Sequence, residues 1–353
     1  MTTILRTNQF IWHRMLLLIC ILITVAGGAA KDTKIVIKMA TIAPDGSPWV
    51  MRMEELADRW RELSDGLVQI RLYPNGVSGD ESDIVRKMRI KMLQGAALTA
   101  KGLGEIDPGI WGLCQPLLVE NGREFEILKA SVDSELRERY WQKGYIVLGW
   151  TNIGWVRWFG VDPIRTPDDL RKTKLFMWEG SNTEGIWKVD GFRAINLSIH
   201  DVMIGLETGL INSLAMVPLS AAVSQWFGLA TYMTDLPWAS LIGGVVIRLE
   251  TWESIPIDIR EKLLVAAAEM ADDVNQSADL LETQAIETMV SYGLTVVETT
   301  PAEKALWSTW LEGHREKLRG VFVDEAMYDL IFDLRKDLRE NGMTNEQTGP
   351  RMK

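Results

Sequence analysis

Cysteine and histidine are scarce in this chain, which has two Cys and three His among 353 residues. Cys20 and His13 lie in an apolar leader at the start of the chain, so the body carries Cys114, His200 and His314. A single Cys cannot form an internal disulfide, and this set of residues excludes a Cys-based zinc site. We therefore predict no disulfide and no metal site.

Motifs that carry catalysis or bind cofactors are also missing. The sequence has no G-x-S-x-G elbow, no P-loop, no H-E-x-x-H pair and no EF-hand spacing. Residues 102–104 begin like a dinucleotide fingerprint, but Asp107 occupies the position of the next glycine. His200-Asp201 matches a base with its orienting acid or, as we favour, the residues that begin a helix at Val202. The sequence therefore predicts no catalytic residue and no cofactor.

Basic residues are outnumbered by acidic ones, with 38 Lys+Arg against 48 Asp+Glu and a net charge of −10. The first 30 residues contain Arg6 and Arg14 but no acid, so the rest of the chain has a net charge of −12. Binding to phosphates needs a basic face, so this balance excludes nucleic acid as a partner. A hydrophobic content of 47% with 24% charged residues is typical of a globular protein rather than a disordered one.

Residues 1–30 are typical of a secretory signal peptide. Arg6 and Arg14 give a basic start, and an apolar run follows at residues 15–25. That run is too short to span a bilayer, and the small residues 28–30 provide a cleavage point. We therefore predict a periplasmic protein; the alternative is a leader that stays attached as a membrane anchor.

The rest of the sequence alternates short apolar runs with amphipathic stretches, which is typical of an α/β fold. Ser47 is a predicted helix N-cap, with Pro48 at the first helical position. Thr166 and Thr300 begin two further helices, each with an acid three residues later. The pattern predicts strands at 35–37, 68–73, 96–99 and 145–150, and helices at 48–63, 80–95 and 120–141.

A long helix is predicted near the C-terminal end. The sequence has no Gly or Pro between Pro256 and Gly293, and apolar residues keep a helical period from Ile259 to Met289. Such a helix is roughly 50 Å long, which is longer than one small domain. We therefore expect it to run along two domains. The residues after Leu338 are polar and are predicted to form a loose tail.

Four stretches resemble the solute-binding proteins of tripartite ATP-independent periplasmic (TRAP) transporters, the dicarboxylate-receptor family. They are residues 73–80, 85–99, 163–170 and 206–212, in the family's order. The resemblance implies a two-lobed periplasmic binding protein fold, hinged by crossing strands and a long helix that spans both lobes. The implied boundaries are 31–153 and 242–285 for lobe I, 154–241 and 286–340 for lobe II, and 341–353 for a polar tail.

Two departures from the family pattern bear on the ligand. In acid-binding members an Arg clamps the substrate carboxylate and an Asn assists it; the matching positions here are Phe176 and Met216. Neither side chain can replace a bidentate Arg–carboxylate contact. Arg157 lies near the position of a second family Arg. It either meets an anion, stacks on Trp155 or Trp158, or pairs with a surface acid.

We therefore predict a solute with a large apolar surface. Six of the 15 Trp lie within residues 141–187, and aromatic walls exclude water while a Met adapts to irregular shapes. The predicted ligand-binding residues are Trp49, Thr99, Trp155, Arg157, Phe176, Trp178, Met216, Pro218 and Trp238.

The resemblance implies a receptor that closes on its solute and delivers it to a TRAP membrane permease driven by an ion gradient. The apolar positions resemble those of a subgroup with a periplasmic tetratricopeptide-repeat partner. One alternative is a receptor for a small carboxylate, anchored by Arg157. Another is a secreted isomerase or dehydratase that uses His200. A third alternative is the binding protein of an ATP-driven transporter, although the long helix counts against it. A fourth alternative is a protein scaffold that binds no small ligand.

Overall fold

The computed structural model describes residues 34–178, 187 and 190–341 of the chain. The predicted signal peptide at 1–30 lies outside these residues, as does nearly all of the predicted tail. None of the helices in the described ranges is long and apolar enough to cross a membrane.

The strands of both lobes belong to one ten-stranded sheet, with the order β2-β1-β3-β9-β4-β7-β5-β6; off this path, β8 pairs with β4 and β10 pairs with β8. The first three strands pair in parallel and form the sheet of lobe I. The strands are β1 (Ile35–Ala40), β2 (Val68–Tyr73), β3 (Gly95–Thr99), β4 (Tyr145–Gly160), β5 (Lys174–Trp178), β6 (Arg193–Leu197), β7 (Ser213–Met216), β8 (Tyr232–Thr234), β9 (Ala239–Arg248) and β10 (Thr295–Val297). The mixed α/β class is therefore confirmed.

Two long antiparallel strands connect the lobes. β4 pairs with β9 from Tyr145 to Val156 and then continues beside β7 and β8 in lobe II. The predicted strand ended at Trp150, which was wrong, because Gly154 does not break the strand. Register shifts lie just before Gly149 and just before Gly154, where a bulge lets the strand bend and continue. Gly154 has φ +130°, a conformation that favours glycine.

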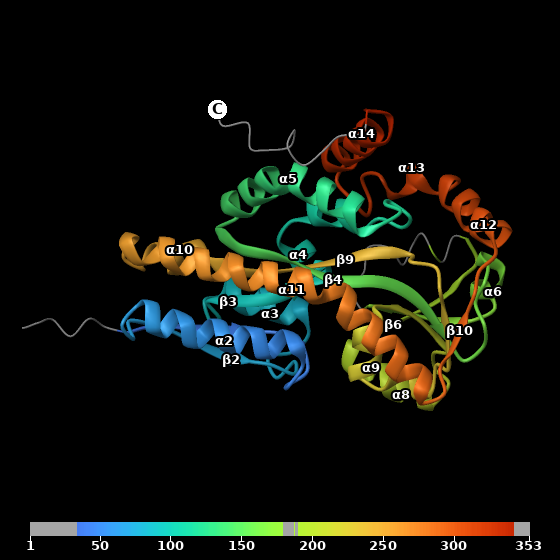
Figure 1. Cartoon of the computed structure of the whole chain (residues 1–353), viewed down its shortest axis with the longest axis horizontal. Coiled ribbons are helices and arrows are strands. Elements are labelled where there is room, and N and C mark those ends of the chain that lie inside the picture. Colours follow the sequence, from blue (N-terminus) through green and yellow to red (C-terminus); the bar gives the residue numbers. More distant parts are fainter. Residues whose placement is uncertain (1–33, 179–186, 188–189, 342–353) are drawn as a thin grey trace, which may run out of the picture.

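The predicted long helix is α11 (Ile257–Ser291), with 35 residues. It contacts α2 (Pro48–Leu63) in lobe I and α9 (Pro218–Val223) in lobe II. Figure 1 shows it crossing from one lobe to the other beside β4. The two-lobed fold with a helix that spans both lobes is confirmed.

Helices cover both faces of the sheet and enclose four apolar cores, two in each lobe. The remaining helices are α3 (Glu81–Arg89), α4 (Ala100–Ile106), α5 (Gly122–Gln142), α6 (Pro167–Arg171), α8 (Val202–Glu207), α10 (Leu249–Glu253), α12 (Pro301–Glu312), α13 (Arg315–Leu318) and α14 (Glu325–Asn341). The predicted caps Ser47, Thr166 and Thr300 each accept a hydrogen bond from the first turn of their helix.

Three local predictions differ from the structure. The helix predicted at 80–95 ends at Arg89, because Lys91 takes a left-handed conformation and Gly95 begins β3. Arg339, predicted in a loose tail, lies in α14 and forms an ion pair of 2.6 Å with Glu124 of α5. Helix α14 packs on α5, so it joins lobe I, whereas the predicted boundary placed residues 286–340 in lobe II.

Candidate functional site

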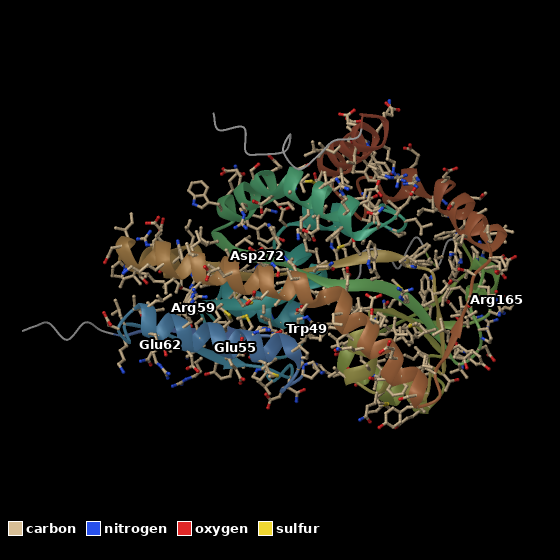
Figure 2. All side chains as sticks on the ribbon, in the orientation of Figure 1. Trp49, Glu55, Arg59, Glu62, Arg165 and Asp272 are labelled. Atoms are coloured by element: carbon tan, nitrogen blue, oxygen red, sulfur yellow. The ribbon has the colours of Figure 1, made fainter. Side chains whose placement is uncertain are left out.

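A cavity of about 290 Å³ lies where the two lobes face each other; we call it the cleft cavity. Lobe I contributes the loop after β1, the start of α2 and the end of β3, and lobe II contributes the end of β5, β7 and α9. Strands β4 and β9 and helix α11 complete it. Figure 2 shows Trp49 at the end of α2 that faces lobe II. The sequence positions the residue there because Ser47 and Pro48 begin the helix just before it.

Charged side chains are missing from the wall of the cleft cavity. Among the described residues that line it there is no Arg, Lys, Asp or Glu. Its polar groups are the hydroxyls of Thr and Ser, the amide of Asn75 and the imidazole of His200. Such a wall offers hydrogen bonds to polar groups of a solute, but no Arg or Lys to balance a buried carboxylate.

Thr99 in the cleft wall is held by a buried carboxylate that sequence reasoning missed. Glu81 accepts hydrogen bonds from the Thr99 amide (2.6 Å), the Thr99 hydroxyl (2.7 Å) and the Gly102 amide (3.0 Å). Glu81 is fully buried, and this burial raises its pKa above the ordinary value. The bonds fix the turn from β3 into α4, where Thr99 also caps α4 through the Lys101 amide. The position of Glu81 in the first turn of α3 was the only sequence signal for this residue.

A second cavity of about 340 Å³, the aromatic cavity, adjoins the first. Both are lined by Trp178, Met216 and Leu241. The aromatic cavity is bordered by a cluster of tryptophans with short ring-to-ring distances. Ring centroids lie 5.2 Å apart between Trp187 and Trp310, which are stacked. The other members of this cluster are Trp158, Trp238 and Trp307.

The structure brings six of the predicted ligand-binding residues to these two cavities. Trp49 and Thr99 line the cleft cavity, Phe176 and Trp238 line the aromatic cavity, and Trp178 and Met216 line both. Phe176 and Met216 also belong to one apolar core of lobe II, since both are buried there. Phe176 and Met216, the two positions at which the family resemblance implies an Arg and an Asn in acid-binding members, therefore belong to one apolar cluster.

Trp155, Arg157 and Pro218 line neither cavity. The ring of Trp155 packs edge-on against Phe125 of α5, with centroids 6.5 Å apart. Pro218 is buried at the first position of α9. These side chains therefore lie outside the walls of the two cavities.

Arg157 is held by an acid of the long helix. Its Nη2 donates to Glu282 Oε1 at 2.9 Å, its Nη1 donates to the Asp235 carbonyl, and Glu282 Oε2 accepts the Trp155 amide at 3.0 Å. The two side chains are only 15% and 10% exposed, so the partner is a buried acid and not the surface acid that we considered. This ion pair ties β4 to α11 at the point where the chain passes between the lobes.

His200 lies across the cleft from lobe I. It is exposed in the short turn before α8, and a Cβ added to Gly76 would lie 2.2 Å from its Cε1. Asp201 occupies the N-cap position of α8, which begins at Val202 as the favoured prediction had it, although the Asp201 side chain makes no capping hydrogen bond. His200 thus marks the contact between the lobes at the cleft cavity, which it also lines.

Comparisons with known proteins agree with this geometry. The family model of bacterial extracellular solute-binding protein, family 7 (DctP) matches residues 39–317. A C4-dicarboxylate-binding periplasmic protein DctP of Rhodobacter capsulatus is 23% identical over 284 residues, covering 77% of this chain and 83% of that protein. A solute-binding protein of Chromohalobacter salexigens is 24% identical over 236 residues, covering 66% and 70%.

Solved structures show the same fold. A TRAP periplasmic solute-binding protein of Desulfovibrio salexigens with bound orotic acid has a TM-score of 0.78 at 15% identity, covering 86% of this chain and 98% of that one. One from Pseudomonas putida with bound D-glucuronate has a TM-score of 0.77 at 17% identity, covering 88% and 98%. The chain therefore belongs to the DctP family of bacterial extracellular solute-binding proteins (family 7), a family of solute-binding proteins rather than enzymes.

Proposed function

We propose that this TRAP receptor captures a solute that is largely apolar and delivers it to the membrane permease of its transporter. The observation that carries the proposal is the cleft cavity, whose described wall has apolar side chains and polar groups, His200 among them, but no Arg or Lys. Similar structures hold acids such as D-glucuronate, D-galacturonate and orotic acid. An acid of that kind needs a cation in its site, whereas an apolar solute does not.

The energetic argument favours the apolar solute. Removing a carboxylate from water costs several kcal/mol unless a cation or several donors replace the water. Phe176 and Met216 provide neither, and the nearest predicted anchor, Arg157, is bound to Glu282. An apolar solute instead gains about 25 cal/mol for each Å² of apolar surface that it buries against Trp49, Trp178 and Met216. The receptor anchored by Arg157 is therefore the less favoured alternative.

Solute binding is proposed to shift the population toward a closed form of the two lobes. Strands β4 and β9 and helix α11 are the connections about which the lobes move, and His200 meets Gly76 where they touch. A tetratricopeptide-repeat protein as an additional periplasmic partner stays a prediction. It is based on the apolar residues at positions 176 and 216.

A thermal-shift screen of residues 31–353 tests the proposal. One panel holds fatty acids, isoprenoids and hydrophobic amino acids, and the other holds dicarboxylates, keto acids and sugar acids. A ligand at 100 times its Kd stabilises the fold by about 2.7 kcal/mol. We expect stabilisation by members of the apolar panel. Trp178→Ala should lower the affinity for these compounds by about tenfold or more. Stabilisation by the dicarboxylates, keto acids or sugar acids, with none by the compounds of the apolar panel, would contradict the proposal of an apolar solute.

A further inference from the structure

The aromatic cavity is not needed to hold a solute in the cleft, yet it adjoins the cleft cavity directly. Trp178, Met216 and Leu241 line both, so they form the border between the two spaces. Each cavity is near the lower end of the range of about 300–1,000 Å³ for ligand sites. A solute that passes this border would use both.

The aromatic cavity differs from the cleft in having a pair of opposite charges in its wall. Lys101 and Glu105, one turn apart on α4, both line it. The Lys101 side chain is only 5% exposed, and its Nζ lies 3.7 Å from Glu105 Oε1. Nζ also donates to the Ser82 hydroxyl, which in turn donates to Glu105 at 3.0 Å. An ammonium has three donors, and its ion pair with Glu105 is long, so it keeps capacity for another acceptor.

The other polar groups of this wall are occupied or uncharged. His314 is fixed between the Trp310 carbonyl, 2.7 Å from Nδ1, and the Asp190 carboxylate, 3.1 Å from Nε2. Burial raises the pKa of the Cys114 thiol to about 12, so the thiol stays neutral. Lys101 and Glu105 therefore give this cavity one positive and one negative charge, each with room for a partner.

We propose that the aromatic cavity is the inner part of the solute site and that the Lys101–Glu105 pair receives the head group of a zwitterion with a large apolar side chain. The carboxylate binds Lys101 Nζ, the ammonium binds Glu105, and the apolar side chain packs on Trp178 and Met216. A plain acid would meet Glu105 without a counter-charge, and a plain amine would meet Lys101. The inference rests on the proposed function and names the class of solute: an α-amino acid with an aromatic or long aliphatic side chain.

Titration calorimetry of residues 31–353 with three probes of one shape tests the head group. L-phenylalanine carries both charges, 3-phenylpropanoate lacks the ammonium, and phenethylamine lacks the carboxylate. We expect L-phenylalanine to bind about tenfold or more tightly than either analogue, since each lost contact is a hydrogen bond to a charged group. Equal affinity for the three probes, or binding of 3-phenylpropanoate alone, would overturn the inference.

Two variants assign the charges. Lys101→Met should bring the affinity for L-phenylalanine down to that for phenethylamine, and Glu105→Gln should bring it down to that for 3-phenylpropanoate. Lys172→Met is the matched control, because it removes the ion pair between the exposed Lys172 and Asp169. It should leave the affinities for all three probes unchanged. An unchanged preference for L-phenylalanine in both folded variants would refute the assignment. If Lys101→Met fails to fold, as judged by circular dichroism, Glu105→Gln decides alone.

The outcome is separable from that of the proposed function. If neutral apolar compounds such as isoprenoids stabilise the protein and none of the three probes binds, the apolar receptor stands and the zwitterion is wrong. If only sugar acids or dicarboxylates bind, both are wrong.

Discussion

The Arg157–Glu282 pair gives a sharp prediction, because its two possible roles have different consequences. Glu282→Ala removes an acceptor of the Arg157 guanidinium and of the Trp155 amide, and it leaves Arg157 buried without its counter-charge. Breaking a buried ion pair by removing one partner costs about 3–5 kcal/mol. For domains of 150–250 residues each kcal/mol lowers Tm by roughly 2–4 °C, and for a longer chain such as this one it lowers Tm by less. We therefore expect Tm to fall by about 3 °C or more.

The assay is urea unfolding followed by far-UV circular dichroism, together with a thermal melt. Arg59→Met is the matched control, because it breaks an ion pair that also involves α11. Arg59 of α2 pairs with Glu269 of α11, and both side chains are about half exposed. Figure 2 labels Arg59 on α2 beside α11. Exposed pairs contribute about 0–1 kcal/mol, so its Tm should fall little. A Glu282→Ala variant no less stable than this control would refute the reasoning.

The same pair separates support of the hinge from solute binding. Arg157→Met should be destabilised, but at a temperature where it is folded it should keep the wild-type affinity for the solute, because Arg157 lines neither cavity. Loss of affinity without loss of stability would make Arg157 the anchor of a carboxylate.

Three further predictions concern single sites. Gly76→Ala should impair closure of the lobes and lower the affinity for the solute, because the added Cβ would clash with His200 and because Gly76 has φ +63°. Adding His200→Ala should restore part of that affinity. An affinity equal to wild type in Gly76→Ala would contradict the contact between Gly76 and His200. Glu81 has a raised pKa, so its contribution to the free energy of unfolding is full below its ordinary value of 4.5 and is lost as pH rises through the folded pKa. Glu81→Gln places an amide N–H donor against the backbone N–H donors of Thr99 and Gly102, so it should lower the free energy of unfolding by about 1–3 kcal/mol. Urea titrations should also show that this pH dependence is lost. An unaltered pH profile would show that Glu81 does not cause it. Cys114, buried and with a pKa of about 12, should not react with a thiol reagent at pH 8 until urea unfolds the protein, and rapid labelling of the native form would contradict its burial.

Most of the fold was predictable because its signals are local. The caps at Ser47, Thr166 and Thr300 need only a few neighbouring residues, and the long helix needs only an uninterrupted period. The extent of β4 was not predictable, because Gly154 is an ordinary sign of a break in a strand. Only pairing with β9, almost a hundred residues away along the chain, shows that the strand continues through a bulge there.

The site was predictable in part for the same reason. Trp49, Thr99, Trp178 and Met216 follow local patterns that the family resemblance places at the cleft. The partner of Arg157 lies 125 residues away on α11, so no spacing rule indicates it. Lys101 has the appearance of an ordinary helix lysine paired with Glu105, and its burial comes from the packing of α3, α4 and lobe II. Contacts between distant segments decide which of these side chains face a solute.

The most direct test of the apolar site is a calorimetric titration of the wild type and of Phe176→Arg/Met216→Asn with D-glucuronate. The wild type should show no binding, because the described wall of the cleft cavity holds no Arg or Lys and because Lys101, in the wall of the aromatic cavity, is already paired with Glu105. The double variant, which introduces the arginine and the amide that the family resemblance implies for acid-binding members, should gain measurable affinity. Tight binding of D-glucuronate by the wild type would contradict the account.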